Sequence, residues 1–306
     1  MTPDLPRGIV PVLQTPFGAD GGIDHSSLAR LIDDAIEGGA AGFLSPAVAS
    51  EVHALTADER ERLLPFVAER IAGRVPLIAG CSSPDAEQSA RLAASAVAAG
   101  ASSILIAIPD SLRGDMDRLT DFFRVAVGGC GLPLIVQDLD WSGPGLRPAA
   151  LAELRGKIPQ LAGCKVESVP AGPKYSEVRS TCGPEFHISG GWAAQQFIEA
   201  LDRRIDALIP EASMVRVYGR IWHLHENGKR ADAIALFREF LPVLAFSNQE
   251  IGLSIAFFKR LLVRRGIFST AAMRAPGFEW DDHALRISDE LIEDCLDVTS
   301  RCPRRV

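Results

Sequence analysis

Hydrophobic and polar positions follow two alternating patterns from the N-terminus to about residue 225. Short runs rich in Val, Ile and Leu alternate with longer amphipathic stretches, which is typical of repeated βα units around a parallel sheet. The short runs predict strands at residues 9–14, 42–46, 77–80, 104–108, 134–137, 161–166, 186–189 and 207–210. The longer stretches predict helices that include residues 26–37, 57–72, 85–99, 117–127 and 193–201. Eight strands in strict alternation with helices favour the α/β class and a closed (β/α)8 TIM barrel.

The turn after the first predicted strand argues against an open sheet that binds a dinucleotide. Such a sheet carries GxGxxG at this turn, whereas residues 15–20 read Thr-Pro-Phe-Gly-Ala-Asp. Further along, Asn227 and Gly228 end a helix, and apolar periodicity predicts three more helices at residues 231–246, 248–265 and 282–299. We therefore expect a barrel at residues 1–225 and a C-terminal helical layer at residues 226–306, packed on the barrel or on a partner subunit.

Composition and charge exclude several classes of partner. The chain has 306 residues, of which 47% are hydrophobic, enough for a sizeable core. A net charge of −7 and a pI near 5.5, with arginines interleaved among Asp and Glu, argue against a nucleic-acid partner. No apolar stretch is long enough to cross a bilayer, and the first residues lack the apolar region of a signal peptide. We therefore predict no membrane partner and a cytoplasmic location.

Cysteine and histidine spacing predicts no metal site and no other cofactor. Six cysteines are scattered without CxxC spacing, which predicts reduced thiols rather than a disulfide framework or a zinc site. His223 and His225 lie two residues apart in a helical pattern, so their side chains point in different directions.

Lysine is scarce, with five lysines against 27 arginines. Lys165 ends the apolar run of residues 161–165, and an amine can lose its proton and attack a carbonyl, whereas a guanidinium cannot. The alternative is a lysine that merely extends from a strand end into water. The other four, Lys157, Lys174, Lys229 and Lys259, fall in segments that we expect to be loops or helix surfaces.

Barrel active sites lie at the C-terminal ends of the strands, which places Lys165 where chemistry is expected. Residues two apart in a strand share a face, so Lys165 and Glu167 can both point into the mouth of the barrel. A neighbouring carboxylate stabilises the ammonium form and opposes nucleophilicity, whereas desolvation favours the neutral amine. The residues alone leave open which effect is larger.

A series of short motifs runs in order along nearly the whole chain. They are residues 8–17 (GIVPVLQTPF), 22–24 (GID), Glu51 with 55–60 (LTADER), 74–80 (RVPLIAG), 132–136 (LPLIV), the strand that ends at Lys165, and 274–276 (RAP). Together they resemble the dihydrodipicolinate synthase and N-acetylneuraminate lyase family. The resemblance implies a barrel with a C-terminal helical extension and a homo-oligomer, either a dimer or a tetramer. It also implies a Schiff base between Lys165 and a 2-oxo acid.

The chain departs from the family pattern at the groups that move protons. The family's GTTGE loop, which binds the substrate carboxylate through backbone N–H groups and a threonine hydroxyl, reads here Ala-Val-Ala-Ser-Glu at residues 47–51. The hydroxyl is lost at Val48, with Ser50 or Ser45 as its replacement. The tyrosines of the YNxP motif and of the PYY turn are absent from residues 136–143 and 109–111, and so is the arginine that binds a second substrate. Lysine biosynthesis is therefore not the expected role.

The same strand ends offer a replacement proton relay. Gln137 can bind a substrate hydroxyl or a water, and Asp138, Glu167 or Glu51 can act as a general base if its pKa is raised in the pocket. Each carboxylate also has a structural alternative, in which Asp138 and Glu51 hold loops and Glu167 pairs with an arginine. We predict catalytic roles for Lys165, Gln137 and Asp138. We predict substrate-binding roles for Val48, Ala49, Ser50, Glu51, Glu167 and Gly190.

Three functions compete. The leading one is a Schiff-base lyase, either an aldolase or a dehydratase, that acts on a pyruvate-like 2-oxo acid such as a 2-oxo-3-deoxy sugar acid. The second is a catalytically impaired member that binds a 2-oxo acid as a sensor or partner subunit, because two relay tyrosines are missing. The third is a metal-dependent barrel aldolase or hydrolase, for which only His53 and His187 lie near strand ends.

Overall fold

Eight parallel strands form the centre of the molecule in the computed structural model, which describes residues 5–191, 194–274 and 277–303. They are β1 (Gly8–Ile9), β2 (Phe43–Ser45), β3 (Leu77–Gly80), β4 (Ser103–Ala107), β5 (Leu134–Leu139), β6 (Leu161–Glu167), β7 (His187–Gly190) and β8 (Ala207–Leu208). Each strand from β2 onward pairs with the next, and β8 pairs with β1. A parallel bridge between Val12 and Leu44 joins the segment after β1 to β2 and closes the barrel. The predicted (β/α)8 barrel is therefore confirmed.

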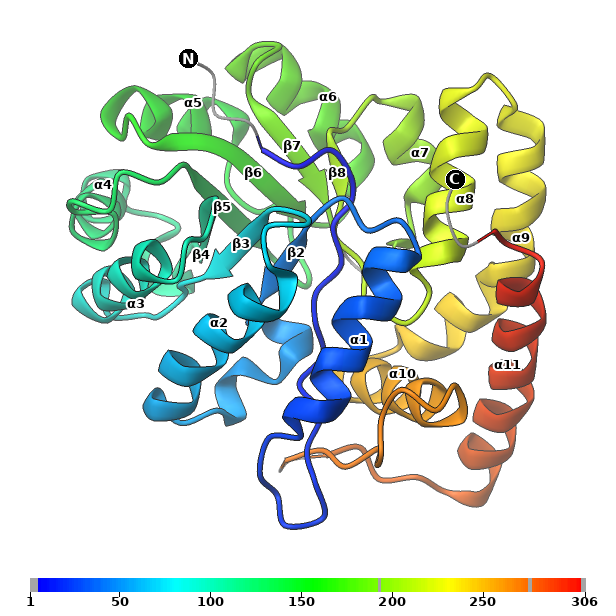
Figure 1. The fold of residues 1–306 in the computed structure, drawn as a ribbon. Coiled ribbons are helices and arrows are strands. Elements are labelled where there is room, and N and C mark those ends of the chain that lie inside the picture. The colour runs from blue at the N-terminus through cyan, green and yellow to red at the C-terminus, as the bar shows by residue number, and fades with distance from the viewer. Residues whose placement is uncertain (1–4, 192–193, 275–276, 304–306) are drawn as a thin grey trace.

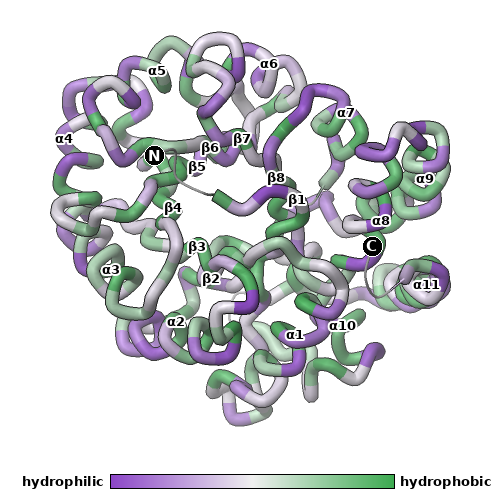
Figure 2. The backbone as a smooth tube through the Cα atoms, turned by 45° about the horizontal axis from the view of Figure 1, so that its top comes forward, coloured by the Kyte–Doolittle hydropathy of each residue, from purple (hydrophilic) through white to green (hydrophobic). Residues whose placement is uncertain are grey.

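Helices follow the strands in turn and lie around them (Figure 2). They are α1 (His25–Glu37), α2 (Ala57–Ile71), α3 (Ala86–Ala98), α4 (Met116–Ala126), α5 (Pro148–Lys157), α6 (Ala171–Cys182), α7 (Phe197–Asp202) and α8 (Val215–Glu226). The first four begin after Asp24, Thr56, Asp85 and Asp115, whose side chains accept hydrogen bonds from backbone N–H groups of the first turn. The predicted helix at 193–201 begins at Ala193, which lies outside the described residues, and α7 begins at Phe197.

The first strand is shorter than predicted. Regular pairing covers Gly8–Ile9 rather than residues 9–14, because Pro11 has no N–H group to donate to a neighbouring strand. Val12 nevertheless bridges both Leu44 and Glu211, so the segment after β1 still lies in the barrel wall.

Apolar side chains fill the barrel lumen below the polar residues of its mouth. One buried cluster includes Val10, Leu44, Ile78, Leu105 and Ile135. On β5, the inward face continues from Ile135 to Gln137, two residues further on. A larger apolar cluster lies between the strands and the surrounding helices. The lumen is therefore a packed core, and chemistry is confined to its upper end.

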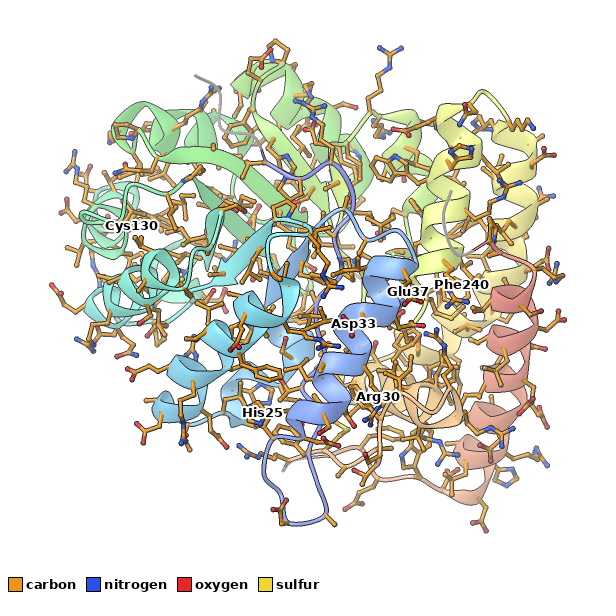
Figure 3. The ribbon with its side chains drawn as sticks, in the orientation of Figure 1. His25, Arg30, Asp33, Glu37, Cys130 and Phe240 are labelled. Carbon is orange, nitrogen blue, oxygen red and sulfur yellow. The ribbon has the colours of Figure 1, made fainter. Side chains whose placement is uncertain are left out.

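Three C-terminal helices lie on one side of the barrel; two of them lie beside α8, and the middle one of the three lies near α1 (Figure 1). They are α9 (Arg230–Ser247), α10 (Ile251–Arg264) and α11 (Asp282–Ser300). Phe240 lies among these helices in Figure 3 and contacts Tyr218 of α8 edge to face, with ring centroids 5.5 Å apart. Phe257 and Phe258 are buried within this chain rather than left for a partner. Because one apolar core runs across residue 225, the division into two domains there stays a prediction.

None of the helices in the described ranges is both long and apolar enough for a membrane span. The cytoplasmic location stays a prediction.

Arg274 fastens the segment after α10 to the barrel. Its guanidinium donates to both carboxylate oxygens of Glu59 at 2.6 and 2.7 Å and to the Gly21 carbonyl at 2.8 Å. The same group lies over the Phe17 ring, 4.4 Å from its centroid. The hydrogen bonds from Arg274 lower the pKa of Glu59 to about 2. The other two residues of the RAP motif, Ala275 and Pro276, lie outside the described residues.

The Glu59–Arg274 pair predicts a pH-dependent contribution to stability. The pKa of Glu59 is lower in the folded protein, about 2, than its ordinary value of 4.5. The contribution is therefore complete above about pH 4.5 and lost as the pH falls toward 2. We expect Glu59→Gln to lower the free energy of unfolding near pH 6, with a difference from wild type that shrinks steadily below pH 4.5. Urea unfolding between pH 6 and 3 measures this. The exposed Glu290→Gln serves as the control, and a difference independent of pH would contradict the assignment.

Candidate active site

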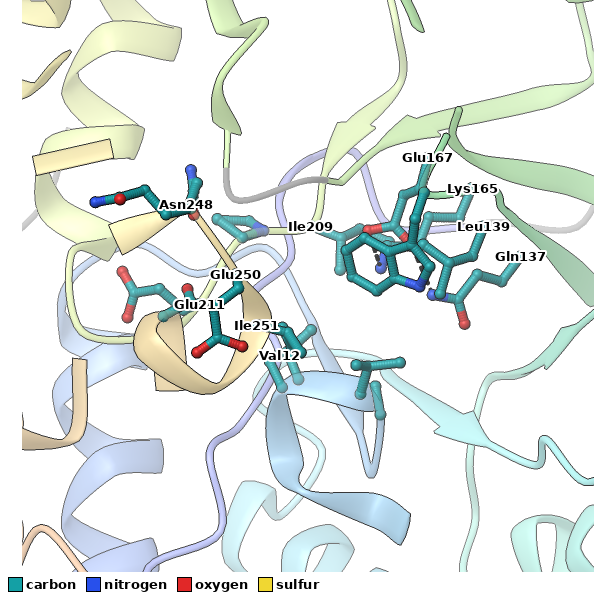
Figure 4. A pocket seen from close by; sticks show the side chains of 17 residues that line it. Val12, Gln137, Leu139, Lys165, Glu167, Ile209, Glu211, Asn248, Glu250 and Ile251 are labelled. Atoms are coloured by element: carbon teal, nitrogen blue, oxygen red, sulfur yellow. Dashed lines mark hydrogen bonds and ion pairs between the residues drawn. The ribbon is translucent and has the colours of Figure 1, made fainter. Parts of the chain in front are cut away.

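Lys165 and Glu167 point inward from the end of β6 and contact each other. Lys165 is 4% exposed and Glu167 7% exposed, and Lys165 Nζ lies 2.9 Å from Glu167 Oε1. On the adjacent β5, Gln137 pairs in register with Lys165, and its Nε2 donates to Glu167 Oε2 at 2.6 Å. Figure 4 shows the three side chains gathered at one side of a pocket. Three of the residues predicted from the sequence are therefore brought together.

The pocket is a cavity of about 410 Å³ at the mouth of the barrel. Beside the Lys165 group, its walls come from the loop after β2, the β5 end, the segment after β8, and the region where α9 meets α10. The residues from these four segments are Ala47, Val48, Ala49, Leu139, Trp141, Ile209, Pro210, Glu211, Asn248, Gln249, Glu250, Ile251 and Ser254, to which Val12 is added.

The loop after β2 has two unused backbone donors, in residues that line the cavity. The amides of Val48 and Ala49 donate to no other group in the part of the chain that the structure describes. Ser50 does not line the cavity, because its hydroxyl donates to the Leu13 carbonyl at 2.6 Å and accepts from the Ala47 amide at 3.0 Å. Ser50 therefore shapes the loop, and the loop can bind a carboxylate through backbone N–H groups alone.

Glu51 also faces away from the cavity and holds the loop from behind. Its backbone is in the left-handed region, with φ of 56°. One carboxylate oxygen contacts the ammonium of Lys259 on α10, and the other accepts from the Arg274 amide at 3.0 Å. The predicted substrate-binding role of Glu51 therefore finds no support in its position, whereas the alternative of a loop-holding carboxylate agrees with it.

Two lysines expected at loop or helix surfaces are buried, and that prediction was wrong for both. Lys259 is 0% exposed, lies 4.5 Å from the Phe17 ring centroid and donates to the Ala272 carbonyl at 2.9 Å. Burial lowers the pKa of Lys259, while the nearby Glu51 carboxylate raises it. Lys174 is 6% exposed and contacts Asp138. A sequence pattern shows that a helix is amphipathic, but it does not reveal an acid elsewhere that neutralises a lysine on its buried face.

Asp138 lies on the outward face of β5, so the structure does not bring it into the pocket. Its carboxylate accepts from Arg113 at 2.7 Å and from the Leu146 amide at 3.0 Å, and it contacts Lys174. Gly145 leaves room for this cluster, because a Cβ there would lie 2.5 Å from an Asp138 oxygen. With both of its carboxylate oxygens engaged, Asp138 organises the loop after β5. Its position gives the predicted catalytic role no support.

The glycines after β7 make room for other side chains. A Cβ on Gly191 would lie 2.0 Å from Glu167 Oε1, so the Glu167 carboxylate occupies space that only glycine leaves free. A Cβ on Gly190 would lie 2.7 Å from the Tyr175 hydroxyl. Gly190, predicted to bind substrate, is not among the residues that line the cavity.

Sequence reasoning missed the residues that α10 and the segment after β8 contribute. Glu211 is buried, and burial raises its pKa. It accepts hydrogen bonds from Gln14 at 3.0 Å and from the Tyr218 hydroxyl at 3.2 Å. Asn248 and Glu250 come from the turn between α9 and α10. Glu211 directly follows the predicted eighth strand, so its place at a strand end could be predicted from the sequence. No sequence signal places the α9–α10 turn over the barrel mouth.

No group of three or more His, Cys, Asp or Glu side chains in the described ranges is arranged to hold a metal ion. His187 is buried, and burial lowers its pKa to about 4. His53 is exposed. The geometry therefore gives the metal-dependent alternative no set of ligands among these residues.

Known proteins match this chain in sequence. The model of the dihydrodipicolinate synthetase family matches residues 5–294. An L-2-keto-3-deoxyarabonate dehydratase of Azospirillum brasilense is 29% identical over 281 residues, which cover 88% of this chain and 88% of that protein. A 4-hydroxy-tetrahydrodipicolinate synthase of Stenotrophomonas maltophilia (strain K279a) is 30% identical over 247 residues, which cover 77% of this chain and 82% of that protein.

Solved structures agree with the sequence matches. The crystal structure of dihydrodipicolinate synthase from Rhodopseudomonas palustris is similar with a TM-score of 0.87 and 26% identity, over 96% of this chain and 99% of that one. The similarity therefore extends from the barrel into the C-terminal helices, as the sequence motifs implied. On the evidence of a family model that matches nearly its full length, this chain belongs to the dihydrodipicolinate synthetase family.

Proposed function

We propose that the protein is a Schiff-base-forming lyase that acts on a pyruvate-like 2-oxo acid. The observation that carries this proposal is the buried contact between Lys165 and Glu167, with 2.9 Å between Nζ and Oε1, in a cavity also lined by Val48 and Ala49, whose amides are unused. The amine supplies a nucleophile, the carboxylate a general base, and the amides a binding place for the substrate carboxylate.

The chemistry begins when Glu167 takes a proton from the ammonium of Lys165, and the neutral amine adds to the C2 carbonyl. The carbonyl oxygen then leaves as water with one proton from the amine and one from Glu167, which forms a protonated imine and restores the Glu167 carboxylate. The imine withdraws electrons from C3. In a dehydration, Glu167 removes a proton from C3 and passes it to the C4 hydroxyl, which leaves as water as a C3–C4 double bond forms. In an aldol cleavage, Glu167 removes the proton of the C4 hydroxyl, the C3–C4 bond breaks to release an aldehyde, and C3 takes up a proton. Hydrolysis of the imine then returns the amine of Lys165.

Gln137 holds the base in position. Its amide N–H donates to Glu167 Oε2, which leaves Oε1 directed at Lys165. Gln137 and Glu167 together therefore take the place of the tyrosine and threonine relay that the chain lacks. A dehydratase named for L-2-keto-3-deoxyarabonate is among the relatives, which supports a 2-oxo-3-deoxy sugar acid as the substrate. The dimeric or tetrameric assembly remains a prediction.

A second function is a binding protein that holds a 2-oxo acid without turnover. The observation in its favour concerns two walls of the cavity, the loop after β2 and the end of β5, where the family carries the hydroxyl groups of its proton relay. In this chain, the apolar side chains of Val48, Leu139 and Trp141 line these walls. Imine formation without product release would support this alternative.

We expect Lys165→Arg to abolish imine formation while the fold persists, because a guanidinium stays protonated and cannot attack the carbonyl. Borohydride reduction in the presence of pyruvate, followed by peptide mass mapping, should give an adduct on Lys165 in the wild type and none in the variant. The matched control is Lys157→Arg on the surface of α5, which should keep the full yield. Adduct formation at wild-type yield in Lys165→Arg would sink the Schiff-base assignment.

We expect Glu167→Gln to lower kcat for a 2-oxo-3-deoxy sugar acid by about 10²–10⁴-fold, because the amide keeps the shape of the side chain but accepts no proton. Trapping of pyruvate by Lys165 should survive, since the amine itself is unchanged. The exposed Glu185→Gln serves as the control. Equal loss of trapping and turnover in Glu167→Gln would indicate that the carboxylate maintains the lysine rather than moving the substrate proton.

A further inference from the structure

The cavity wall across from Lys165 carries negative charge and no cation. Figure 4 places Asn248 and Glu250 on the opposite side of the pocket from Lys165 and Gln137. Among the described residues that line the cavity, Lys165 is the one cation, whereas Glu167, Glu211 and Glu250 bear carboxyl groups and no arginine is present. In a protein with 27 arginines, the far wall thus lacks the side chain best suited to bind a second carboxylate.

The one backbone feature that would attract an anion at this wall is already occupied. The first turn of α10 exposes N–H groups and the positive end of the helix dipole, which together favour an anion. The chain fills this place itself, because Glu250 accepts from the Gly252 amide at 3.0 Å and from the Leu253 amide at 2.6 Å. A substrate carboxylate arriving here would meet a carboxylate instead of free N–H groups.

The remaining polar groups of the far wall suit hydroxyls. Gln249 and Ser254 add uncharged donors and acceptors to the lining. Hydroxyl groups can accept from an uncharged donor such as the Ser254 hydroxyl and donate to a carboxylate such as Glu250, whereas a carboxylate can do only the first.

We propose that the substrate carries a single carboxylate, next to its 2-oxo group, and ends in an uncharged, hydroxyl-bearing group. Glu250 is the residue that excludes 2-oxo diacids. This inference rests on the proposed function and specifies its substrate. Monoacids and diacids both bind through their 2-oxo acid group at Lys165. The Glu250 carboxylate then disfavours the diacid by repelling its second carboxylate.

A pair of compounds of equal length tests the proposal. A 2-oxo-3-deoxypentonate and 4-hydroxy-2-oxoglutarate share their first four carbons and differ at C5, which is a hydroxymethyl group in one and a carboxylate in the other. The measured quantity is the concentration of each that gives half-maximal borohydride trapping at Lys165. We expect the wild type to prefer the pentonate by about tenfold or more, since like charges facing each other across an interface are strongly disfavoured.

Glu250→Ser removes the charge and keeps an oxygen that can cap α10. We expect this variant to reduce the preference at least about fivefold, mainly through tighter binding of the diacid. Asp281→Ser is the matched control, because Asp281 caps α11 by accepting from the Ala284 amide at 2.7 Å and does not line the cavity. It should leave the preference unchanged.

Salt distinguishes repulsion from steric exclusion. Raising the ionic strength from about 20 mM to about 0.5 M should narrow the wild-type preference and leave that of Glu250→Ser nearly constant, because added salt screens charges at an open cavity mouth. Equal trapping of the two compounds by the wild type, or an unchanged preference in Glu250→Ser, overturns the proposal. Trapping of pyruvate in the same preparations reports on Lys165 separately, so a failed Schiff-base assignment would be recognised as such.

Discussion

The buried ion pair between Lys259 and Glu51 is the interaction on which the rest of the site depends. It joins α10, near the end of the chain, to the loop after β2, and both partners are almost fully buried. Removing one member of such a pair leaves an uncompensated charge and typically costs about 3–5 kcal/mol. The first turn of α10 forms the far wall of the cavity, while its third turn fixes the loop that offers the Val48 and Ala49 amides. One helix therefore sets the distance between the two ends of the pocket.

Side chains alternate between the two faces of each strand, so some polar groups face the cavity and others face the surrounding loops and helices. On β5 and β6, Gln137, Lys165 and Glu167 face the lumen and contact one another. Asp138, between two inward positions, faces outward and is neutralised by Arg113 and Lys174. Both clusters place buried carboxylates beside cations, but one opens onto a cavity and the other is closed by Leu146 and Gly145. Access to a cavity thus separates the cluster that we propose for catalysis from the structural one.

The barrel and the position of Lys165 could be predicted from the sequence because both follow local rules. Apolar runs mark the strands, and active sites lie at their C-terminal ends. The inward position of Glu167 follows from the two-residue period of a strand. By the same period, Gln137 is in phase with Lys165, whereas Asp138 is not. The ion pair between Lys259 and Glu51 could not be predicted, because the two residues are 208 positions apart and no local sequence pattern connects them. The same holds for the α9–α10 turn, because its place over the mouth is set by helix packing.

The distribution of lysines affects how readily carbonyl compounds can react with amines on the protein surface. Lys165, Lys174 and Lys259 are buried and ion-paired, which leaves Lys157 and Lys229 as the lysines with amines open to solvent. Arginine supplies the rest of the basic surface, and a guanidinium that stays protonated does not condense with carbonyl groups as an amine does. Aldehydes and oxo acids would therefore meet few amines on the outer surface, whereas Lys165, the residue proposed to form the imine, opens onto the cavity.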